Sequence, residues 1–310
     1  MKHLLSVTFA FLILVNTAFP REDVFSKVKH HYADNDGVKI HYVTLGEGPV
    51  LLMLHGFPDF WYTWRYQMEE LSKDYKVVAV DLRGYNKSDK PKGVKQYTMP
   101  ILMKDVIAVI DDLKLNKATI ISNDWGGAIA WQVATYYPNR VDKFIACNIP
   151  HPVGIANYLR ENPKTGQYAQ DFKDKDAASK LTAEGLAGLH GKLSDLDRNR
   201  YIRAFRNSSF EGMLNYYKAN YPNPANNTAG LNQPAPAIRK VKSPVLMIYG
   251  MKDKALPPGM LNNSWDFVDN EVTIYTIPEA GHFVQQEAHE KVNRVIKTWL
   301  SQYTEEGGEQ

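Results

Sequence analysis

Short apolar segments alternate along the chain with longer segments whose apolar residues recur every three or four positions. The short segments are rich in β-branched residues and predict buried strands at 50–54, 77–80, 119–122, 144–146, 245–249 and 272–277. The longer segments predict helices at 61–71, 99–113, 127–137 and 287–303. This alternation is typical of a mostly parallel sheet that is covered by helices.

The sheet is expected to begin with an antiparallel hairpin. Two further strand-like segments, 29–33 and 38–44, flank the turn Asn35-Asp36-Gly37. Asn, Asp and Gly tolerate the left-handed backbone that a tight hairpin requires. Together with the six buried strands, this hairpin predicts an α/β fold with an eight-stranded, mostly parallel sheet.

The pattern changes between residues 150 and 240. Charged, helix-like stretches with aromatic residues are followed by a Pro- and Asn-rich run at 221–237, with no strong strand signal. A segment of this length between two core strands usually covers a functional site, so we interpret it as an inserted helical cap. The alternative is a helical excursion that covers a sheet edge. The core is then divided into 21–149 and 241–303, and 304–310 is expected to be a frayed tail.

Composition narrows the class of protein. The 310 residues are 44% hydrophobic and 23% charged, as in an ordinary globular protein large enough for one sizeable α/β domain. The formal net charge of +3 is too small to indicate that the protein binds a polyanion, so nucleic acid is not an expected partner. Cys147 is the only cysteine, which excludes an intrachain disulfide.

The first residues have the pattern of a secretory signal. Met1-Lys2-His3 precedes an apolar run at 4–15, which is shorter than the roughly 20 residues of a membrane-spanning helix. We therefore expect a signal peptide at 1–20 and an exported protein, periplasmic or secreted. Ala18 suits cleavage, whereas Asn16 does not, which leaves a retained N-terminal anchor as the alternative.

The strongest chemical signal is the turn Ser122-Asn123-Asp124-Trp125-Gly126-Gly127. It follows a predicted strand and precedes a predicted helix, and its small residues suit a strained strand-to-helix turn that presents a nucleophile. The apex residue is Asp124. A carboxylate there attacks saturated carbon and forms an alkyl ester, which points to epoxides or alkyl halides. The alternative is that Asp124 caps the helix.

Two further residues complete a triad in the order expected for this fold. Asp253 follows the strand at 245–249, and His282 follows the strand at 272–277. We predict that His282 activates water and that Asp253 orients its imidazole. Other acids and histidines lack this context; Glu279 and Asp266 are weaker alternatives for the acid, and the residues expected to be structural are His30, His31 and His289.

The segment Leu54-His55-Gly56-Phe57-Pro58 predicts a sharp turn after the third strand. Such a turn can aim a backbone N–H into the site. We predict that the N–H groups of Phe57 and Trp125 form an oxyanion hole, which stabilises charge on the ester when water attacks it. His55 is expected to stabilise the turn.

The chain resembles the epoxide hydrolases of the α/β-hydrolase fold over nearly its whole length after the predicted signal. The motifs that carry the resemblance are His-Gly-Phe-Pro-Asp-Phe-Trp-Tyr-Thr-Trp-Arg-Tyr-Gln at 55–67, Asp-Leu-Arg-Gly-Tyr at 81–85, Asp-Trp-Gly-Gly at 124–127 and Asn-Ile-Pro-His-Pro at 148–152. Two residues depart from the family's pattern. Asn123 stands where the family usually has histidine, and Ser122 stands where glycine is usual. These changes remove no reacting group.

The resemblance implies that the cap supplies two tyrosines that bind and protonate the epoxide oxygen. Leu214-Asn215-Tyr216-Tyr217 is similar to the second tyrosine motif and assigns this role to Tyr217. Tyr168, with Phe172 four residues later, matches the first motif more loosely. The alternative is that these tyrosines only pack in the cap.

The expected reaction converts a hydrophobic epoxide and water into a vicinal diol, with no metal and no organic cofactor. Substrate contacts are expected from four aromatic residues: Phe57, Trp125, Phe172 and Phe283. The sequence leaves a homodimer open. Two alternatives are a haloalkane or haloacid dehalogenase with the same nucleophile, and a secreted, non-catalytic interaction protein with this fold. In one branch of the haloalkane dehalogenases, an asparagine at the position of Phe57 holds the halide. The phenylalanine at this position therefore disfavours that activity.

Overall fold

A computed structural model describes residues 23–222 and 239–303. The predicted signal at 1–20, the tail at 304–310 and most of the Pro- and Asn-rich run lie outside these residues. The strands form an eight-stranded sheet in the order β1-β2-β4-β3-β5-β6-β7-β8. Their bounds are β1 Lys29–Asn35, β2 Val38–Leu45, β3 Val50–Leu54, β4 Lys76–Val80, β5 Ala118–Asn123, β6 Val141–Cys147, β7 Val245–Gly250 and β8 Val272–Ile277.

The first two strands form the expected hairpin. Asn35 lies opposite Val38, and the two residues between them, Asp36 and Gly37, have φ angles of 51° and 83°. Positive φ at both central positions is the geometry of a tight hairpin turn. Strand β2 then pairs antiparallel with β4, and the strand pairs from β4 to β8 are all parallel. The predicted sheet is therefore confirmed.

Helices cover both faces of the sheet. The chain moves from β3 through α2 to β4 in one direction along the sheet, and from β4 through α3 to β5 in the other. Since both crossovers connect parallel strands and such connections are right-handed, α2 and α3 lie on opposite faces. Helix α11 packs against α2, and α4 packs against α3. The core helices are α1 Val24–Lys27, α2 Arg65–Leu71, α3 Met99–Asp112, α4 Asp124–Tyr136, α10 Val284–Glu287 and α11 His289–Ser301.

Three of the predicted helices differ from the structure by more than the last residue. Helix α4 begins at Asp124, three residues before the predicted start, because Asp124 to Gly126 were assigned to the strand-to-helix turn and in fact form the first turn of the helix. Glycine is a poor helix former, but the small size of Gly126 and Gly127 permits close packing. The last predicted helix divides at Ala288, which has the non-helical angles φ −130° and ψ 38°. The first turn of the helix predicted at 61–71 is a 3₁₀ segment, Trp61–Trp64.

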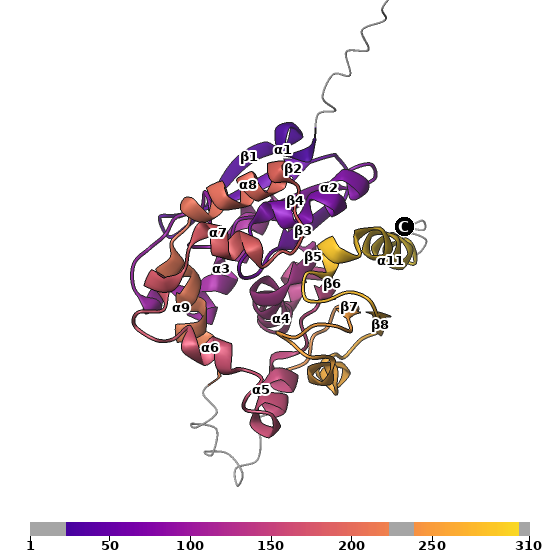
Figure 1. The fold of residues 1–310 in the computed structure, drawn as a ribbon. Helices are drawn as coiled ribbons and strands as arrows, with labels where there is room; N and C mark the ends of the chain where they lie inside the picture. The colour runs from indigo at the N-terminus through magenta and orange to yellow at the C-terminus, as the bar shows by residue number, and fades with distance from the viewer. Residues whose placement is uncertain (1–22, 223–238, 304–310) are drawn as a thin grey trace, which may run out of the picture.

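Helices also dominate the described part of the segment between β6 and β7. They are α5 Pro152–Glu161, α6 Gln167–Asp171, α7 Ala183–Gly188, α8 Asp195–Arg206 and α9 Phe210–Asn220. Figure 1 shows α6 to α9 gathered on one side of the molecule, away from α11. Helix α9 is fixed to the core at Tyr216, whose hydroxyl donates to the carbonyl of Arg83 at 2.8 Å. We refer to α5–α9 and their loops as the cap.

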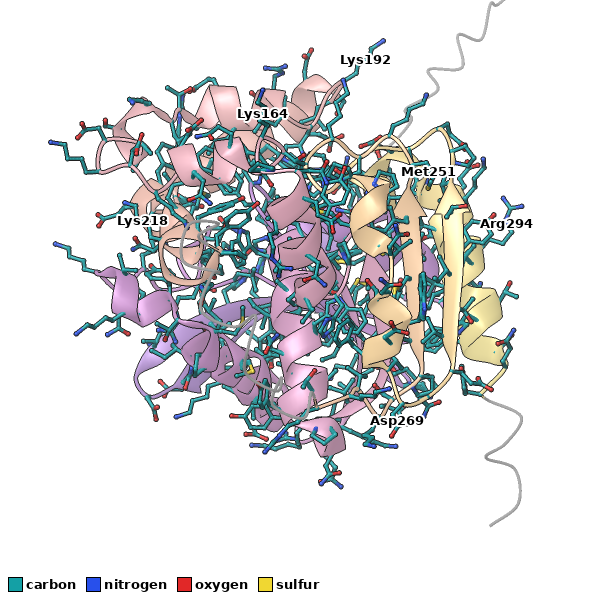
Figure 2. The ribbon with its side chains drawn as sticks, turned by 90° about the horizontal axis from the view of Figure 1, so that it is seen from below. Lys164, Lys192, Lys218, Met251, Asp269 and Arg294 are labelled. Atoms are coloured by element: carbon teal, nitrogen blue, oxygen red, sulfur yellow. The ribbon has the colours of Figure 1, made fainter. Side chains whose placement is uncertain are left out.

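Charged residues of both signs project from the surface, as Figure 2 shows for Lys192 and Lys218 of the cap and for Asp269 and Arg294 of the core. The described residues include no helix that is long and apolar enough to cross a membrane.

Candidate active site

The carboxyl ends of the parallel strands place the candidate residues together. Gly56 and Phe57 follow β3, Asp124 follows β5, Asp253 follows β7 and His282 follows β8. In a parallel sheet these ends share one edge, which is where α/β proteins bind ligands. The fold therefore brings residues from four distant parts of the sequence to one site.

Asp124 occupies a strained turn that only small neighbours permit. Its φ of 49° lies in the left-handed region, which is unfavourable for a residue with a side chain. A Cβ on Gly56 would lie 2.3 Å from the Asp124 side chain, and one on Gly126 would lie 2.4 Å from the carbonyl oxygens of Leu54 and His55. These glycines allow the turn and the β3 loop to approach each other.

The Asp124 carboxylate faces other loops and not only its own helix. Its Oδ1 accepts a hydrogen bond of 2.7 Å from the Phe57 N–H, and its Oδ2 lies 3.5 Å from Nε2 of His282. Helix capping alone does not account for these contacts. The Trp125 N–H lies in the first turn of α4, where it has no intrahelical acceptor, and its role as the second oxyanion donor stays a prediction.

His282 is held between two carboxylates. Its Nδ1 lies 2.8 Å from Oδ2 of Asp253, and its Nε2 faces Asp124. Burial lowers the pKa of His282, but Asp253 and Asp124 outweigh burial and raise this pKa to about 10. Because Nδ1 donates to Asp253, Nε2 is the nitrogen that is directed toward the reacting centre.

Asp253 is ionised although it is buried. Its Oδ1 accepts from the N–H groups of Ala255 and Leu256 at 2.8 and 2.9 Å. Burial raises the pKa of Asp253, but the positive charge of His282 and these hydrogen bonds outweigh burial and hold the pKa below its usual value. The carboxylate can therefore orient His282 and stabilise its positive charge.

Asn148, at the end of β6, was assigned no role from the sequence. Its Nδ2 donates to Oδ2 of Asp253 at 2.6 Å, and its Oδ1 accepts from the N–H of Gly250 at 2.7 Å. Asn148 is fully buried and has a φ of 48°, so it occupies a second left-handed position beside the site. The only sequence signal was its place in the motif at 148–152.

Replacing Asn148 with glycine is expected to move the acidic limb of the kcat profile to higher pH. Glycine tolerates the left-handed backbone but removes the hydrogen bond to ionised Asp253, which raises the pKa of that carboxyl. His282 requires ionised Asp253, so activity is lost earlier as the solution is acidified. The surface variant Asn162→Ala is the control, and an unshifted profile in Asn148→Gly would contradict this role.

Asn123, which stands where the family usually has histidine, hydrogen-bonds residues on both sides of the site. Its Nδ2 donates to the carbonyls of Cys147 and His282 at 2.9 and 3.3 Å, and its Oδ1 accepts from Gln285 at 3.3 Å. Asn123 therefore fixes the backbone that carries His282. Cys147 itself is buried in β6.

Aromatic side chains surround the Asp124 carboxylate. The Tyr217 ring packs edge-to-face against Phe57, Trp125 and Phe172, with centroid separations of 5.6, 5.0 and 5.1 Å. The Tyr168 ring lies 6.5 Å from that of Tyr217. Burial raises the pKa of both phenols well above the ordinary value, and the charge of Asp124 adds to this. Both are therefore protonated at neutral pH and able to donate.

Two cavities, of about 300 and 600 Å³, have Asp124, Tyr168 and Tyr217 in common in their walls. The smaller one continues along apolar residues such as Ile149 and Ile155, and its wall includes Trp125. The walls of the larger one include His282 and the rings Phe57, Phe172 and Phe283. The four predicted substrate contacts thus line space that adjoins the carboxylate.

The weaker candidates lie elsewhere. Glu279 is exposed and pairs with Lys291, and Asp266 is exposed in a 3₁₀ segment. The His289 ring stacks on Tyr66. His30 and His31 lie on β1, where they contact His41 and Thr44. His55 accepts from the Leu82 N–H and bonds to the Gly56 carbonyl, as expected for a residue that stabilises the turn.

The sheet order and the Asp124 turn define an α/β hydrolase, and the family model described as "alpha/beta hydrolase fold" matches residues 49–288. Epoxide hydrolase 1 of Caenorhabditis elegans is 34% identical over 86% of this chain and 69% of its own. Epoxide hydrolase 4 of Homo sapiens is 32% identical over 87% of this chain and 78% of its own. The chain therefore belongs to the epoxide hydrolases of the α/β-hydrolase superfamily.

Solved structures agree with this membership. The crystal structure of an epoxide hydrolase from Bacillus megaterium in complex with an inhibitor matches with a TM-score of 0.79 and 33% identity. The match covers 87% of this chain and all of that chain. The predicted family and fold are confirmed.

Proposed function

We propose that this enzyme hydrolyses epoxides to vicinal diols through a covalent ester on Asp124. The observation that carries the proposal is the Asp124 carboxylate, placed between the Phe57 N–H and His282 and facing two cavity-lining tyrosines. The related epoxide hydrolases of Caenorhabditis elegans, Homo sapiens and Bacillus megaterium support the same reaction class.

The first half-reaction forms the ester. Oδ1 of Asp124 is held by Phe57, which leaves Oδ2 to attack a ring carbon of the epoxide. The carbon–oxygen bond of the ring breaks, and its electron pair goes to the departing oxygen. Tyr168 and Tyr217 hold that oxygen and supply a proton, because their phenols are protonated at neutral pH. The product is a hydroxyalkyl ester of Asp124.

Ester formation prepares His282 for the second half-reaction. In the free enzyme, the charges of Asp253 and Asp124 keep the pKa of His282 near 10, so the imidazole is protonated. Esterification removes the Asp124 charge and with it part of the attraction for that proton, which lowers the pKa of His282. His282 gives up this proton to the phenol–alkoxide group and becomes a base.

The second half-reaction releases the diol. Nε2 of His282 takes a proton from water, and the hydroxide adds to the carboxyl carbon of Asp124. Charge develops on Oδ1, where the Phe57 N–H already donates. Collapse of this intermediate expels the diol oxygen, which takes the proton back from His282. The Asp124 carboxyl then gives the remaining proton of the attacking water to His282, which restores the carboxylate and the protonated imidazole. The diol keeps the former Oδ2, and the carboxylate keeps the oxygen of water.

The reaction class is tested by a panel of small epoxides and haloalkanes. We expect diol from the epoxides and little halide from the haloalkanes. The two phenols can give a proton to a developing alkoxide, whereas a departing halide needs no proton. Halide release without diol would favour the dehalogenase alternative. The absence of both products would favour a non-catalytic protein.

Replacing Tyr217 with phenylalanine is expected to slow ester formation about 10-fold to 100-fold, because one proton donor to the epoxide oxygen is lost. The double variant with Tyr168→Phe should be slower still. Single-turnover ester formation, measured by rapid quench and mass spectrometry, gives the rate. The control is Tyr136→Phe, an exposed tyrosine of α4. Wild-type rates in the double variant would remove both tyrosines from the mechanism.

We also propose that the protein is exported, on the basis of Met1-Lys2-His3 and the apolar run at 4–15. Cell fractionation combined with the N-terminal sequence of the mature protein tests this proposal. Full-length protein in the cytoplasm would contradict it. A homodimer stays a prediction that analytical ultracentrifugation can test.

A further inference from the structure

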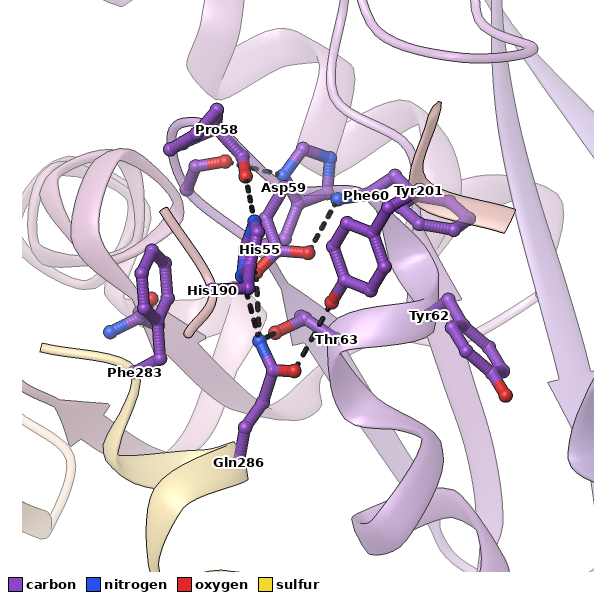
Figure 3. Close-up of polar contacts among 12 residues, drawn as sticks. His55, Pro58, Asp59, Phe60, Tyr62, Thr63, His190, Tyr201, Phe283 and Gln286 are labelled. Carbon is purple, nitrogen blue, oxygen red and sulfur yellow. Dashed lines mark hydrogen bonds and ion pairs between the residues drawn. The ribbon is translucent and has the colours of Figure 1, made fainter. Parts of the chain in front are cut away.

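A histidine of the cap reaches into the core beside the catalytic loops. His190 lies between α7 and α8, and its side chain is only 1% exposed. Its Nε2 lies 2.7 Å from the carbonyl oxygen of Pro58, and its ring lies 4.4 Å from that of Phe283 (Figure 3). Pro58 follows the oxyanion donor Phe57, and Phe283 follows the base His282. One cap side chain thus touches both catalytic loops.

The hydrogen bonds around His190 define its tautomer. A carbonyl oxygen only accepts, so Nε2 must carry a proton and donate to Pro58. The orientation of the Gln286 amide is also defined, because its Oε1 accepts from Arg65 at 2.8 Å and from Tyr201 at 3.2 Å. Its Nε2 is therefore the donor end of the amide, and it lies 2.9 Å from Oγ1 of Thr63, 3.2 Å from Oδ2 of Asp59 and 3.4 Å from Nδ1 of His190 (Figure 3).

His190 is neutral, with Nε2 as its donor and with Nδ1 directed toward the amide group of Gln286. Burial lowers its pKa to about 3, which agrees with this tautomer. Since the ring is uncharged, the approach of its Nδ1 to Oδ2 of Asp59 at 3.8 Å is not an ion pair. The contact to Pro58 is therefore a fixed, directional hydrogen bond over the working pH range.

We propose that His190 is a positioning residue that holds the Phe57–Pro58 loop, so that correct placement of the cap also aligns the oxyanion donor. This proposal rests on the proposed function. The connection is short: His190 holds the Pro58 carbonyl, and the neighbouring Phe57 N–H donates to Asp124 at 2.7 Å.

The two half-reactions depend differently on this alignment. Ester formation requires the nucleophile and the tyrosines, whereas the Phe57 N–H gains most when charge develops on Oδ1 during ester hydrolysis. Complete removal of an oxyanion donor costs about 100-fold to 1,000-fold in rate, so its misalignment should cost less, about 10-fold. Loss of the His190 donor should therefore slow hydrolysis and leave ester formation nearly unchanged.

Two substitutions separate the donor from the ring. His190→Phe keeps an aromatic ring against Phe283 but removes the donor, and His190→Gln offers an amide N–H near the original Nε2. The control is His289→Phe, because His289 packs on Tyr66 in the core. Rapid-quench mass spectrometry on a small epoxide gives the rates of ester formation and ester hydrolysis. Hydrogen exchange of a peptide covering 54–60 reports on the loop without any substrate.

We expect about 10-fold slower hydrolysis, ester accumulation and faster exchange of the 54–60 peptide in His190→Phe, with His190→Gln within about 3-fold of wild type. Equal slowing in both variants, or slower ester formation with a raised KM and normal hydrolysis, would overturn the proposal and indicate general support of the cap. If His190→Phe does not fold, His190→Ser removes the same donor.

The outcome is separable from that of the proposed function. If the wild-type enzyme makes no diol, the proposed function fails, and the exchange measurement still decides whether His190 holds the loop. Unchanged exchange at 54–60 in the donor-less variant would then refute the positioning role.

Discussion

Replacing Asp124 with alanine is expected to lower kcat by at least about 10,000-fold, because the variant has no group that can form the ester. Asp253, the other acid of the site, cannot substitute, since its carboxylate is occupied by His282, Asn148 and two backbone N–H groups. The measurement is diol formation under substrate saturation, with folding checked by circular dichroism.

Asp266→Ala is the matched control, because Asp266 is an exposed acid that lies outside the site. This variant should retain wild-type activity. Substantial turnover by Asp124→Ala would mean that water attacks the epoxide directly, and the ester mechanism would be wrong.

Replacing His282 with glutamine is expected to trap the ester. Ester formation needs Asp124 and the two tyrosines, which remain, whereas hydrolysis needs a base that glutamine cannot supply. We expect hydrolysis to slow by about 1,000-fold or more, so that the ester accumulates within one turnover. Intact-protein mass spectrometry should show an increase equal to the full mass of the epoxide, since ring opening expels no leaving group.

The double variant Asp124→Ala and His282→Gln provides the control for this adduct. It should show no mass increase, and peptide mapping of the single variant should place the adduct on Asp124. An adduct on another residue, or normal turnover by His282→Gln, would contradict the assigned roles.

Much of the fold was predictable because its signals are local. Apolar runs marked the strands, and the turn Asn35-Asp36-Gly37 marked the hairpin. The three triad candidates could be found because each follows a recognisable strand, and parallel strands bring their carboxyl ends to one edge. The start of α4 was predicted three residues too late, because Asp124 to Gly126 were assigned to the strand-to-helix turn, whereas they form the first turn of the helix.

Other parts of the site had no local signal. Asn148 contacts Asp253 across 105 residues of sequence, and His190 contacts Pro58 across 132. Such pairs form only when two strands or a cap loop and a strand end have been placed by the whole fold. Asn123 was noticed as a departure from the family, but its bonds to Cys147 and His282 could be described only from the structure.

The ester on Asp124 is tested most directly by a single turnover of the unmodified enzyme in ¹⁸O-labelled water. With enzyme in excess over a small epoxide, we expect the diol to receive its new oxygen from Asp124 and to be unlabelled. The label should appear in the peptide that contains Asp124. A labelled diol with an unlabelled Asp124 peptide would show direct attack by water and contradict the ester mechanism.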